Sequence, residues 1–575
     1  MFDDAIFVSD DEGEEEERPR EEEGVNYHDR IFPEDTPTPP EVKPVPRPIS
    51  FIDITLEYID HCGNNFRPGK TAELVDGTFI QIKSIVERHR TDYTETLLIG
   101  PCFKRCRSFE GLFPSKLNEV AMFSSSKDVS ISRILRPRIL IRTNASWPKF
   151  NDIRGYTKEE AENSGKLVCR WEATIPVHTS TRYLYTGVLR RLREDEVDPK
   201  FRVSDRKLRR GWRGPQDGVR PGVSEGNRYT FGDSFCGGGG MSCGAQAAGF
   251  ETSWGFDFDK DACNTYRRNF PSAQVFMTPV DLFVTAFAER ELQVDVIHLS
   301  PPCQPHSPAH TVPGKNDDEN EAAGLCIGDI LQKIRPRYAT LEQTDGIIHR
   351  PEWFNVVMWS FVSAGFSVTW KVLQCVQYGT PQTRKRLFIM AACPGELLPT
   401  FPEPIYAQPN RVPTPFNLAQ NHGLLPPRTL GDAIGHLDPD ADLIDERNGG
   451  PHLRFTEPRA TPNRWDEPLR NTIKAGSGNY DVHPSFLRRF TVRELACLQT
   501  FPDHHEFCGI FGMQRRQVGN AVPPVVGAAI LGQVRKALEA SDANDVDMED
   551  EEDKEDDDEC MGAEGGSQDN PLIID

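Results

Sequence analysis

The sequence predicts an α/β protein in which a mostly parallel sheet is preceded by a small all-β module. A β-prone run at 229–235 leads directly into glycines 237–240 and a helical stretch, and a second run at 294–299 stops at the double proline 301–302. Strands that alternate with helices are typical of a sheet covered on both faces. Residues 49–185 instead show short segments with period-2 alternation, which predicts the β module.

Length and charge limit the kinds of partner. At 575 residues the chain is long enough for two or three hydrophobic cores. Residues 1–24 hold 12 acidic residues against 2 arginines, and residues 539–575 hold 17 against 1 lysine, so the net charge of −22 comes from the ends. The rest of the chain has 59 acidic and 63 basic residues. A mildly basic body is compatible with a polyanionic partner such as nucleic acid.

Cysteine usage and hydropathy predict the compartment. The 14 cysteines stand at irregular positions, and the closest approach to a zinc-type pair, Cys102 and Cys106, lacks a second half. We therefore expect free thiols in a reducing compartment. The sequence has no run of about 18 apolar residues and no basic, apolar leader at its acidic N-terminus. These features predict a soluble intracellular protein without a membrane partner.

Both ends of the chain are expected to be disordered. Residues 1–48 are acidic and then proline-rich, and residues 539–575 are strongly acidic, so neither segment has enough apolar residues for a core. Residues 6–12 and 571–575 are short β-prone segments beside acidic residues. They resemble SUMO-interacting motifs, which add a strand to the edge of a partner's sheet. The alternative is a solvated tail whose apolar residues bind nothing.

The predicted β module covers residues 49–188, with strands expected at 78–85, 96–99 and 138–142. The order of its segments resembles a BAH domain, a chromatin-reading β-fold, which implies chromatin proteins as possible partners. The alternative is an accessory domain that only packs on its neighbour.

A basic linker, residues 189–228, follows the module. Its basic cluster is typical of a nuclear-localisation patch or a phosphate contact, and equally of a solvated linker. The cluster consists of Arg202, Arg206, Lys207, Arg209, Arg210, Arg213 and Arg220.

One cysteine stands at a rigid bend. Residues 299–307 read Leu-Ser-Pro-Pro-Cys-Gln-Pro-His-Ser, and the end of a strand in an α/β sheet is where such folds bind ligands. Pro302 and Pro305 each fix their own φ and restrict the residue before them, so the backbone around Cys303 is constrained. A lone cysteine is most often a buried structural thiol. The motifs around Cys303 favour a positioned nucleophile instead.

Further motifs lie at the ends of the other predicted elements. Asp233 precedes the pattern Phe-x-Gly-x-Gly at 235–239, where glycine lets the backbone approach a ligand or adopt a positive φ. By itself this loop suits a dinucleotide pyrophosphate equally well. The predicted strand 338–341 ends in Glu-Gln-Thr at 342–344, and residues 382–386 read Gln-Thr-Arg-Lys-Arg.

Two motifs complete the C-terminal part. Thr491, followed three residues later by Glu494, predicts the capped start of a helix. Residues 517–524 read Gln-Val-Gly-Asn-Ala-Val-Pro-Pro and lead into a terminal helix.

In this order, the motifs resemble those of the C5-cytosine DNA methyltransferases across residues 229–538. The resemblance implies a Rossmann-like methyltransferase sheet that binds S-adenosylmethionine. It also implies that the thiolate of Cys303 adds to C6 of cytosine, which makes C5 able to attack an electrophilic methyl group. Only roughly 3% of a thiol with a pKa near 8.5 is ionised at pH 7. The site must therefore lower that pKa or deprotonate the thiol on attack.

The same resemblance assigns the first part of a cofactor site. Asp233, Phe235, Gly237 and Gly239 are expected to form the loop that holds the cofactor. Asp257 lies at the end of the next predicted strand, where a carboxylate accepts hydrogen bonds from ribose hydroxyls. The family usually has glutamate at that position, and a solvated strand-end charge is the alternative.

The remaining implied cofactor contacts lie further along the chain. Asp281, with Leu282 beside it, falls where the family contacts adenine, and an ordinary helix N-cap is the alternative for Asp281. Asn520 is expected to return to the cofactor pocket, together with Val522.

The implied catalytic set is Cys303, Glu342, Arg384 and Arg386. Glu342 is expected to hydrogen-bond N3 and the exocyclic amine of cytosine while Cys303 adds. Arg384 is expected to reach the cytosine and Arg386 to support it, because residues two apart on a strand share one face. The family normally has Glu-Asn-Val where this chain has Glu-Gln-Thr at 342–344, a departure expected to affect the rate rather than the reaction type.

The resemblance divides the rest of the chain into a catalytic core at 229–393 and 487–538, with a small target-recognition region at 394–486 between them. The implied substrate is double-stranded DNA in the nucleus, and Glu-Gln-Thr together with the β module resembles the fungal Masc/RID type, associated with silencing of repeats. The alternatives are a chromatin-bound scaffold that has lost catalysis, a tRNA C5-cytosine methyltransferase, and a nicotinamide-binding oxidoreductase.

Overall fold

A computed structural model describes most of the chain. All described residues from Ile52 onwards belong to one compact unit. The expected nucleophile Cys303, the segments 6–12 and 571–575, and the end of the basic linker lie outside the described residues. The described residues are 51–114, 116–147, 157–175, 185–214, 229–286, 292–302, 326–409, 423–438, 453–457, 463–476 and 482–561, with side chains described as far as 545.

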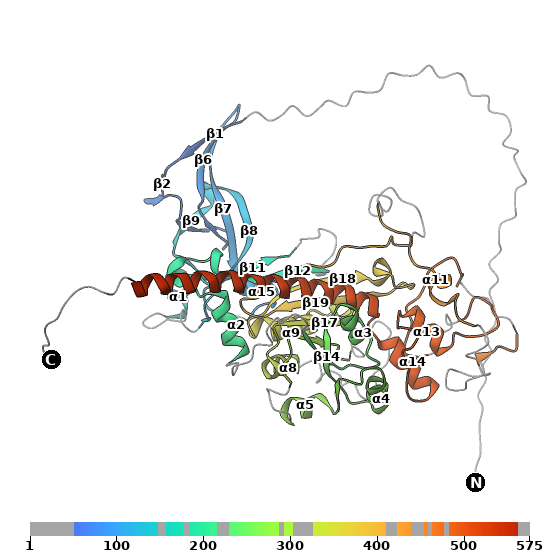
Figure 1. The fold of residues 1–575 in the computed structure, drawn as a ribbon. Helices are drawn as coiled ribbons and strands as arrows, with labels where there is room; N and C mark the ends of the chain where they lie inside the picture. Colours follow the sequence, from blue (N-terminus) through green and yellow to red (C-terminus); the bar gives the residue numbers. More distant parts are fainter. Residues whose placement is uncertain are drawn as a thin grey trace, which may run out of the picture. The chain divides into compact units, whose positions relative to one another are not determined.

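A mostly parallel sheet forms the C-terminal half, as predicted (Figure 1). Its neighbouring parallel strands are, in order, β15 (Gln274–Met277), β14 (Glu251–Asp257), β13 (Thr230–Ser234), β16 (Val296–Leu299) and β17 (Tyr338–Thr344). β19 (Lys385–Ala392) then pairs antiparallel with both β17 and β18 (Ser367–Gln374). The carboxyl ends of the parallel strands therefore meet at one edge of the sheet.

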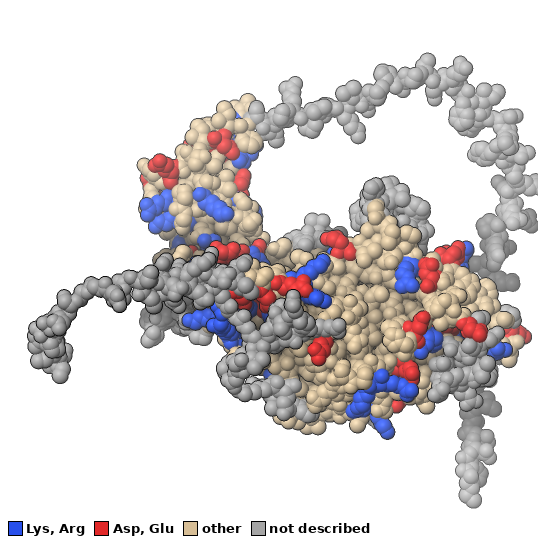
Figure 2. Space-filling model, viewed as in Figure 1, with Lys and Arg blue, Asp and Glu red and all other residues tan. Residues whose placement is uncertain are grey.

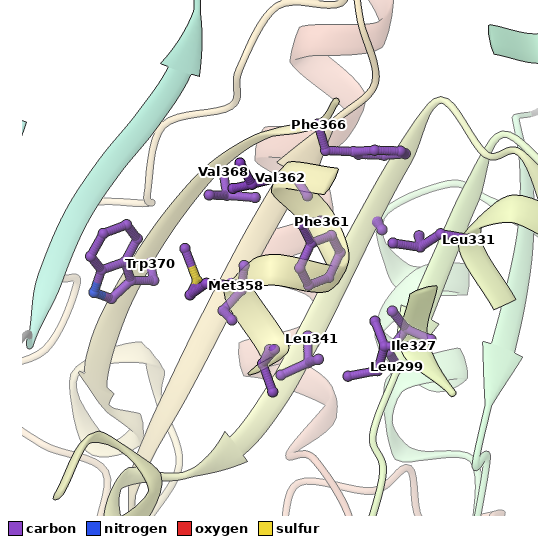
Figure 3. Packing of buried hydrophobic residues seen from close by; sticks show 14 of the residues in the cluster. Leu299, Ile327, Leu331, Leu341, Met358, Phe361, Val362, Phe366, Val368 and Trp370 are labelled. Carbon is purple, nitrogen blue, oxygen red and sulfur yellow. The ribbon is translucent and has the colours of Figure 1, made fainter. Parts of the chain in front are cut away.

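Alternate residues of these strands face two different helical layers. On one face, Leu299 and Leu341 pack with α8 (Ile327–Ile334) and α9 (Pro351–Ser363) (Figure 3), and α5 (Val280–Ala286) joins the same cluster. On the other face, Val296 and Tyr338 pack against α3 (Gly240–Ala247) and α15 (Pro524–Met561). Because both faces are covered, β16 and β17 are buried along their whole length, including the polar residues at the end of β17.

The C-terminal helices begin at polar caps. In α13 (Val492–Leu498), the Thr491 hydroxyl accepts from the backbone N–H of Glu494, and the Glu494 carboxylate accepts from the N–H of Thr491. This confirms the predicted capped helix start. α13 packs between α11 (Leu430–Ile434) and α14 (Phe511–Asn520) through a shared hydrophobic cluster.

The N-terminal module is built almost entirely of strands and has hydrophobic clusters of its own. A strand covers the expected 96–99, whereas the strands expected at 78–85 and 138–142 are each interrupted, at 82–83 and at 139. Its elements are β1 (Ile52–Leu56), β2 (Ile59–His61), β3 (Asn64–Phe66), β4 (Thr71–Leu74), β5 (Phe79–Gln81), β6 (Ser84–His89), β7 (Thr94–Arg105), β8 (Glu119–Ser130), β9 (Ile134–Arg138), β10 (Leu140–Arg142), α1 (Lys158–Ser164), β11 (Leu167–Thr174) and β12 (Thr186–Arg191).

β12 joins the module to the parallel sheet. It pairs antiparallel with β11 on one side and with β18 on the other. Gly187 lies directly opposite Trp370, and a Cβ at Gly187 would stand 2.3 Å from the buried indole ring. The expected module boundary at 188 therefore falls inside a strand. β12 continues past it because its backbone N–H and C=O groups pair with those at the free edge of β18.

Part of the basic linker forms a helix, α2 (Asp205–Arg213), that packs on the sheet. Arg213 donates to the carbonyl of Val294 at 2.7 Å, and Arg209 donates to that of Gly395 at 2.6 Å. Arg209 also forms an ion pair with Asp545. These two arginines therefore do not belong to a solvated linker, because their side chains fasten α2 to the sheet and to the C-terminal helix. Arg202, Lys207 and Arg210 remain exposed.

The terminal helix α15 continues past the expected core boundary at 538. Ser541 is buried, and Asp542 accepts from Nη2 of Arg337 at 2.6 Å and from the Tyr229 hydroxyl at 2.8 Å. The first residues of the segment expected to be a disordered tail are therefore part of the fold. Their charges are tolerated because Arg209 and Arg337 neutralise them.

Acidic and basic side chains are interspersed over the described surface seen in Figure 2. None of the helices in the described part of the chain is long and apolar enough to cross a membrane.

We predict that Gly187→Ala destabilises the protein by about 1–3 kcal/mol, because the added methyl group overlaps the buried Trp370 ring. Gly211→Ala in α2 is the matched control, since nothing lies within 4 Å of its added Cβ. Denaturant unfolding monitored by tryptophan fluorescence compares the two variants. Equal stability of both would show that β12 and β18 do not pack as described.

Candidate active site

A pocket opens at the carboxyl ends of β13, β14, β16 and β17, where α/β sheets bind ligands. Its lining comes from segments far apart in the sequence. These are the loop after β13 (233–241), the end of β14 and start of α4 (Lys260–Asn269) at 257–262, the prolines after β16 (300–302), the end of β17 (342 and 344), Arg386, and residues 513–522.

The glycine loop is held in a conformation that leaves backbone open to the pocket. Gly237 has φ +50°, and a Cβ there would meet nothing within 4 Å. Phe235 also has a positive φ of 60°, which is uncommon for a residue with a side chain. At the end of the loop, a Cβ on Gly240 would stand 2.3 Å from the carbonyl oxygen of Val522. The loop therefore packs tightly on the C-terminal segment while its middle faces open space.

Asp233 is a buried hydrogen-bond acceptor at the start of the glycine loop. Its side chain is 1% exposed and accepts from the Ser242 hydroxyl at 2.5 Å, and that hydroxyl also contacts the Tyr266 hydroxyl. Burial raises the pKa of Asp233 to about 8, with a smaller contribution from the nearby Asp257, although the Ser242 hydrogen bond opposes the shift. Asp233 thus links β13 to the first turn of α3.

Asp257 lies where the sequence predicted a strand-end carboxylate. One of its oxygens accepts from the N–H of Gly237 and the other from the N–H of Asp259, both at 2.9 Å. Burial raises the pKa of Asp257, and these backbone hydrogen bonds partly offset that effect. Each carboxylate oxygen keeps a second lone pair, so Asp257 both orients the glycine loop and can accept from a ligand.

Three predicted cofactor residues lie outside the pocket lining. Gly239 has φ +81°, and its Cβ would stand 2.4 Å from the Phe270 ring, so it permits packing against α4. Asp281 and Leu282 are exposed at the start of α5. Asn520 and Val522, by contrast, do line the pocket.

Glu342 and Arg386 form an ion pair at the other end of the pocket. Nε of Arg386 lies 2.8 Å from Oε1 of Glu342, and the Glu342 residue is 8% exposed. The pairing of β17 with β19 sets Thr344 directly opposite Arg386 and so brings the arginine to the end of β17. A carboxylate and a guanidinium are thereby fixed beside each other on adjacent strands.

The two arginines do not share one face as predicted. Arg384 is 1% exposed and donates to the backbone carbonyls of Ile473, Gly519 and Ala521 at 3.0–3.3 Å. The period-2 argument fails because β19 begins at residue 385, so Arg384 lies before the strand. Arg386, rather than Arg384, reaches the pocket, and Arg384 positions the segment 519–521 that lines it.

Gln343 supports the chain that leads to Cys303. Its Nε2 donates to the carbonyl of Pro301 at 2.7 Å, and the side chain is 3% exposed. Pro301 and Pro302 both line the pocket. Gln343, which stands where the family has asparagine, therefore holds the segment that comes directly before Cys303.

Sequence reasoning missed two polar groups of the pocket. Oγ1 of Thr344 and Oε1 of Gln517 are buried and have no hydrogen-bond partner among the described residues. Thr344 was detectable, because it stands two residues after Glu342 and so shares its face of β17. Gln517 begins the motif at 517–524, but nothing in that motif assigned its side chain to the pocket, because α14 reaches the pocket only through tertiary packing.

Curated relatives of the chain are methyltransferases. The chain is 29% identical over 343 residues to "Type II methyltransferase M1.HphI" of Haemophilus parahaemolyticus, a match that covers 53% of this chain and 87% of that protein. It is 26% identical over 431 residues to "DNA (cytosine-5)-methyltransferase 4" of Arabidopsis thaliana, with 53% of this chain and 28% of the other covered.

Among solved structures, a putative DNA modification methyltransferase encoded within a prophage of E. coli is similar, at 23% identity and a TM-score of 0.37. The match covers 54% of this chain and 99% of that one.

A family model described as "C-5 cytosine-specific DNA methylase" matches residues 229–536, which is more than half of the chain. Enzymes of this kind use S-adenosylmethionine, and this is the cofactor of the chain. The match begins one residue before β13 and ends within α15, so it contains every segment that lines the pocket. The chain therefore belongs to the C-5 cytosine-specific DNA methylase family and is a DNA (cytosine-5)-methyltransferase.

Proposed function

We propose that the enzyme methylates C5 of cytosine in double-stranded DNA through a covalent adduct with Cys303. One observation carries the proposal: the glycine loop, the Glu342–Arg386 ion pair and the prolines that lead to Cys303 all border one pocket. A cofactor loop on one side and a base-recognising carboxylate on the other suit the transfer of a group between two ligands.

The residues at the glycine-loop end suit S-adenosylmethionine, which supplies an electrophilic methyl group when bound. The open backbone at Gly237 leaves room for a ligand, and the Asp257 carboxylate can accept from ribose hydroxyls. The unpartnered Oε1 of Gln517 offers a further buried acceptor in the pocket. Asn520 adds an amide that both donates and accepts. Asp281 and Leu282 remain the proposed adenine contacts.

The other end of the pocket suits a cytosine ring. The Cys303 thiolate forms a bond to C6, and C5 then has the electron density of an enamine. In this proposal the Glu342 side chain, which pairs with Arg386, accepts from the exocyclic amine and shares a proton with N3, and so stabilises charge in the ring. Once C5 carries the methyl group, loss of its proton returns the electron pair to the ring and breaks the bond to sulfur.

Access to this pocket requires the target base to leave the duplex, because Glu342 is buried at the end of β17. The basic excess of the chain between its acidic ends supports a DNA substrate. We assign target recognition to residues 394–486, which the structure describes in part, including α11.

The finer assignment rests on the sequence resemblance. We propose a nuclear enzyme of the Masc/RID type that acts in silencing of repeats, with a BAH-like module for chromatin proteins. Glu-Gln-Thr at 342–344 supports this type. Gln343 positions the segment before Cys303, because its amide donates to the Pro301 carbonyl. SUMO binding through 6–12 and 571–575 remains a prediction.

We predict that wild-type protein, incubated with S-adenosylmethionine and duplex DNA containing 5-fluorocytosine, forms an adduct that survives denaturation. Fluorine at C5 blocks the proton loss that releases the enzyme, so the bond to sulfur persists. Cys303→Ala should abolish the adduct, as judged by denaturing electrophoresis. Cys62→Ser, at an exposed cysteine of the β module, is the control and should form it normally. Cofactor binding without any adduct would favour the catalytically impaired scaffold.

Glu342→Gln should lower kcat/KM by roughly 100- to 10,000-fold, because the amide keeps the size of the side chain but loses its charge toward the ring and toward Arg386. The affinity for S-adenosylmethionine, measured by titration calorimetry, should change little. Methyl-transfer assays with radiolabelled cofactor provide the rate. A variant with the wild-type rate would remove Glu342 from the chemistry.

Gln343→Leu should slow adduct formation by about tenfold or more, because the leucine fills similar space but leaves the buried Pro301 carbonyl without its donor. Gln343→Asn, which keeps an amide on a shorter side chain, is the matched comparison and should retain more activity. Single-turnover trapping measures both rates. If Leu and Asn behave alike, the tether does not govern the position of the nucleophile.

A further inference from the structure

A second cluster of reactive side chains lies away from the methyl-transfer pocket. His436 follows α11, Cys497 lies on α13, and Asp503 lies in the turn after α13. One ligand atom from each residue lies within 4.8 Å of the other two. Nε2 of His436 is 3.1 Å from Oδ2 of Asp503, and Sγ of Cys497 is 3.4 Å from Oδ1 of the same carboxylate.

The spacing of these atoms suits one tetrahedral metal ion. Zinc bonds of about 2.0–2.3 Å to nitrogen, oxygen and sulfur place ligand atoms roughly 3.3–3.8 Å apart. The separations of 3.1 Å and 3.4 Å, which run to the two oxygens of Asp503, lie close to this range, and the three ligand atoms all lie within 4.8 Å of one another. A thiolate, an imidazole and a carboxylate together select zinc over magnesium or calcium, which bind oxygen ligands. The thiolate and the carboxylate also balance the charge of a divalent ion.

The cluster is open on one side. Cys497 is 8% exposed, whereas the side chains of His436 and Asp503 are 51% and 65% exposed. An ion can therefore enter from solvent, and a water molecule can occupy the fourth position. The buried sulfur anchors the ion, and the two exposed ligands close on it from the surface.

We propose that His436, Cys497 and Asp503 bind one zinc ion that fastens the target-recognition region to the catalytic core. The two helices that the ion would join are already adjacent, since α11 and α13 pack in one hydrophobic cluster. α13 packs in turn on α14, whose end lines the methyl-transfer pocket. The ion thus links a segment assigned to DNA recognition to α13, which packs on the helix that lines the pocket. The methyl transfer itself does not need this ion.

The test uses the full-length protein, stripped with a chelator and then dialysed against zinc. Atomic emission should find about one zinc ion per chain. Cys497→Ser and His436→Ala should each weaken zinc binding by at least about tenfold, because each removes one of three protein ligands. The matched controls are His504→Ala, a neighbouring exposed histidine outside the cluster, and Cys62→Ser. Both should retain the wild-type zinc content.

Cobalt replacement provides a second readout that does not depend on activity. A thiolate-to-cobalt charge-transfer band should appear in the wild type and in His504→Ala and be lost in Cys497→Ser. His436→Ala changes an exposed residue, so its fold is expected to persist, and circular dichroism verifies this. Absence of bound zinc in the wild type, or equal zinc content in His436→Ala and His504→Ala, would overturn the proposal.

Discussion

The reversed direction of β19 is the constraint on which the catalytic end of the pocket depends. Since β19 runs antiparallel to β17, the first residues of β19 lie beside the last residues of β17. Arg386 therefore meets Glu342 at the edge where the parallel strands end. A parallel strand in the same place would bring its final residues there instead. The direction of one strand thus determines which part of the sequence contributes the arginine.

Motif spacing predicted the parts of this site that depend on local sequence. Asp233, Asp257 and Glu342 lie at strand ends that the apolar runs already marked, so their meeting at one edge followed from the fold class. The placement of Arg386 rather than Arg384 at the pocket did not follow, because it depends on where β19 begins. The sequence also could not predict the pairing of β12 with β18 or the contacts of α2, since they join residues nearly 200 positions apart.

Charge composition predicted a disordered tail from residue 539, but the start of this segment is part of the terminal helix α15. Residues 539–545 belong to a helix because their partners are arginines that composition assigned to the linker and the core. Arg337 pairs with both Glu396 and Asp542, and the carboxylates around it raise the pKa of its guanidinium. Such buried charges favour one arrangement of the chain more than they add net stability, because desolvation offsets much of their attraction. Counting charges along the chain cannot show which of them meet.

The shared strand β12 has a consequence for how the enzyme can be divided. If the chain were cut before residue 229, β18 would lose its neighbour and present a row of unpaired backbone groups. Exposed edges of this kind recruit strands from other molecules, and the uncovered Trp370 would add an adhesive apolar surface. An isolated catalytic fragment would therefore tend to self-associate. In the intact chain, β12 protects this edge of the sheet from such contacts.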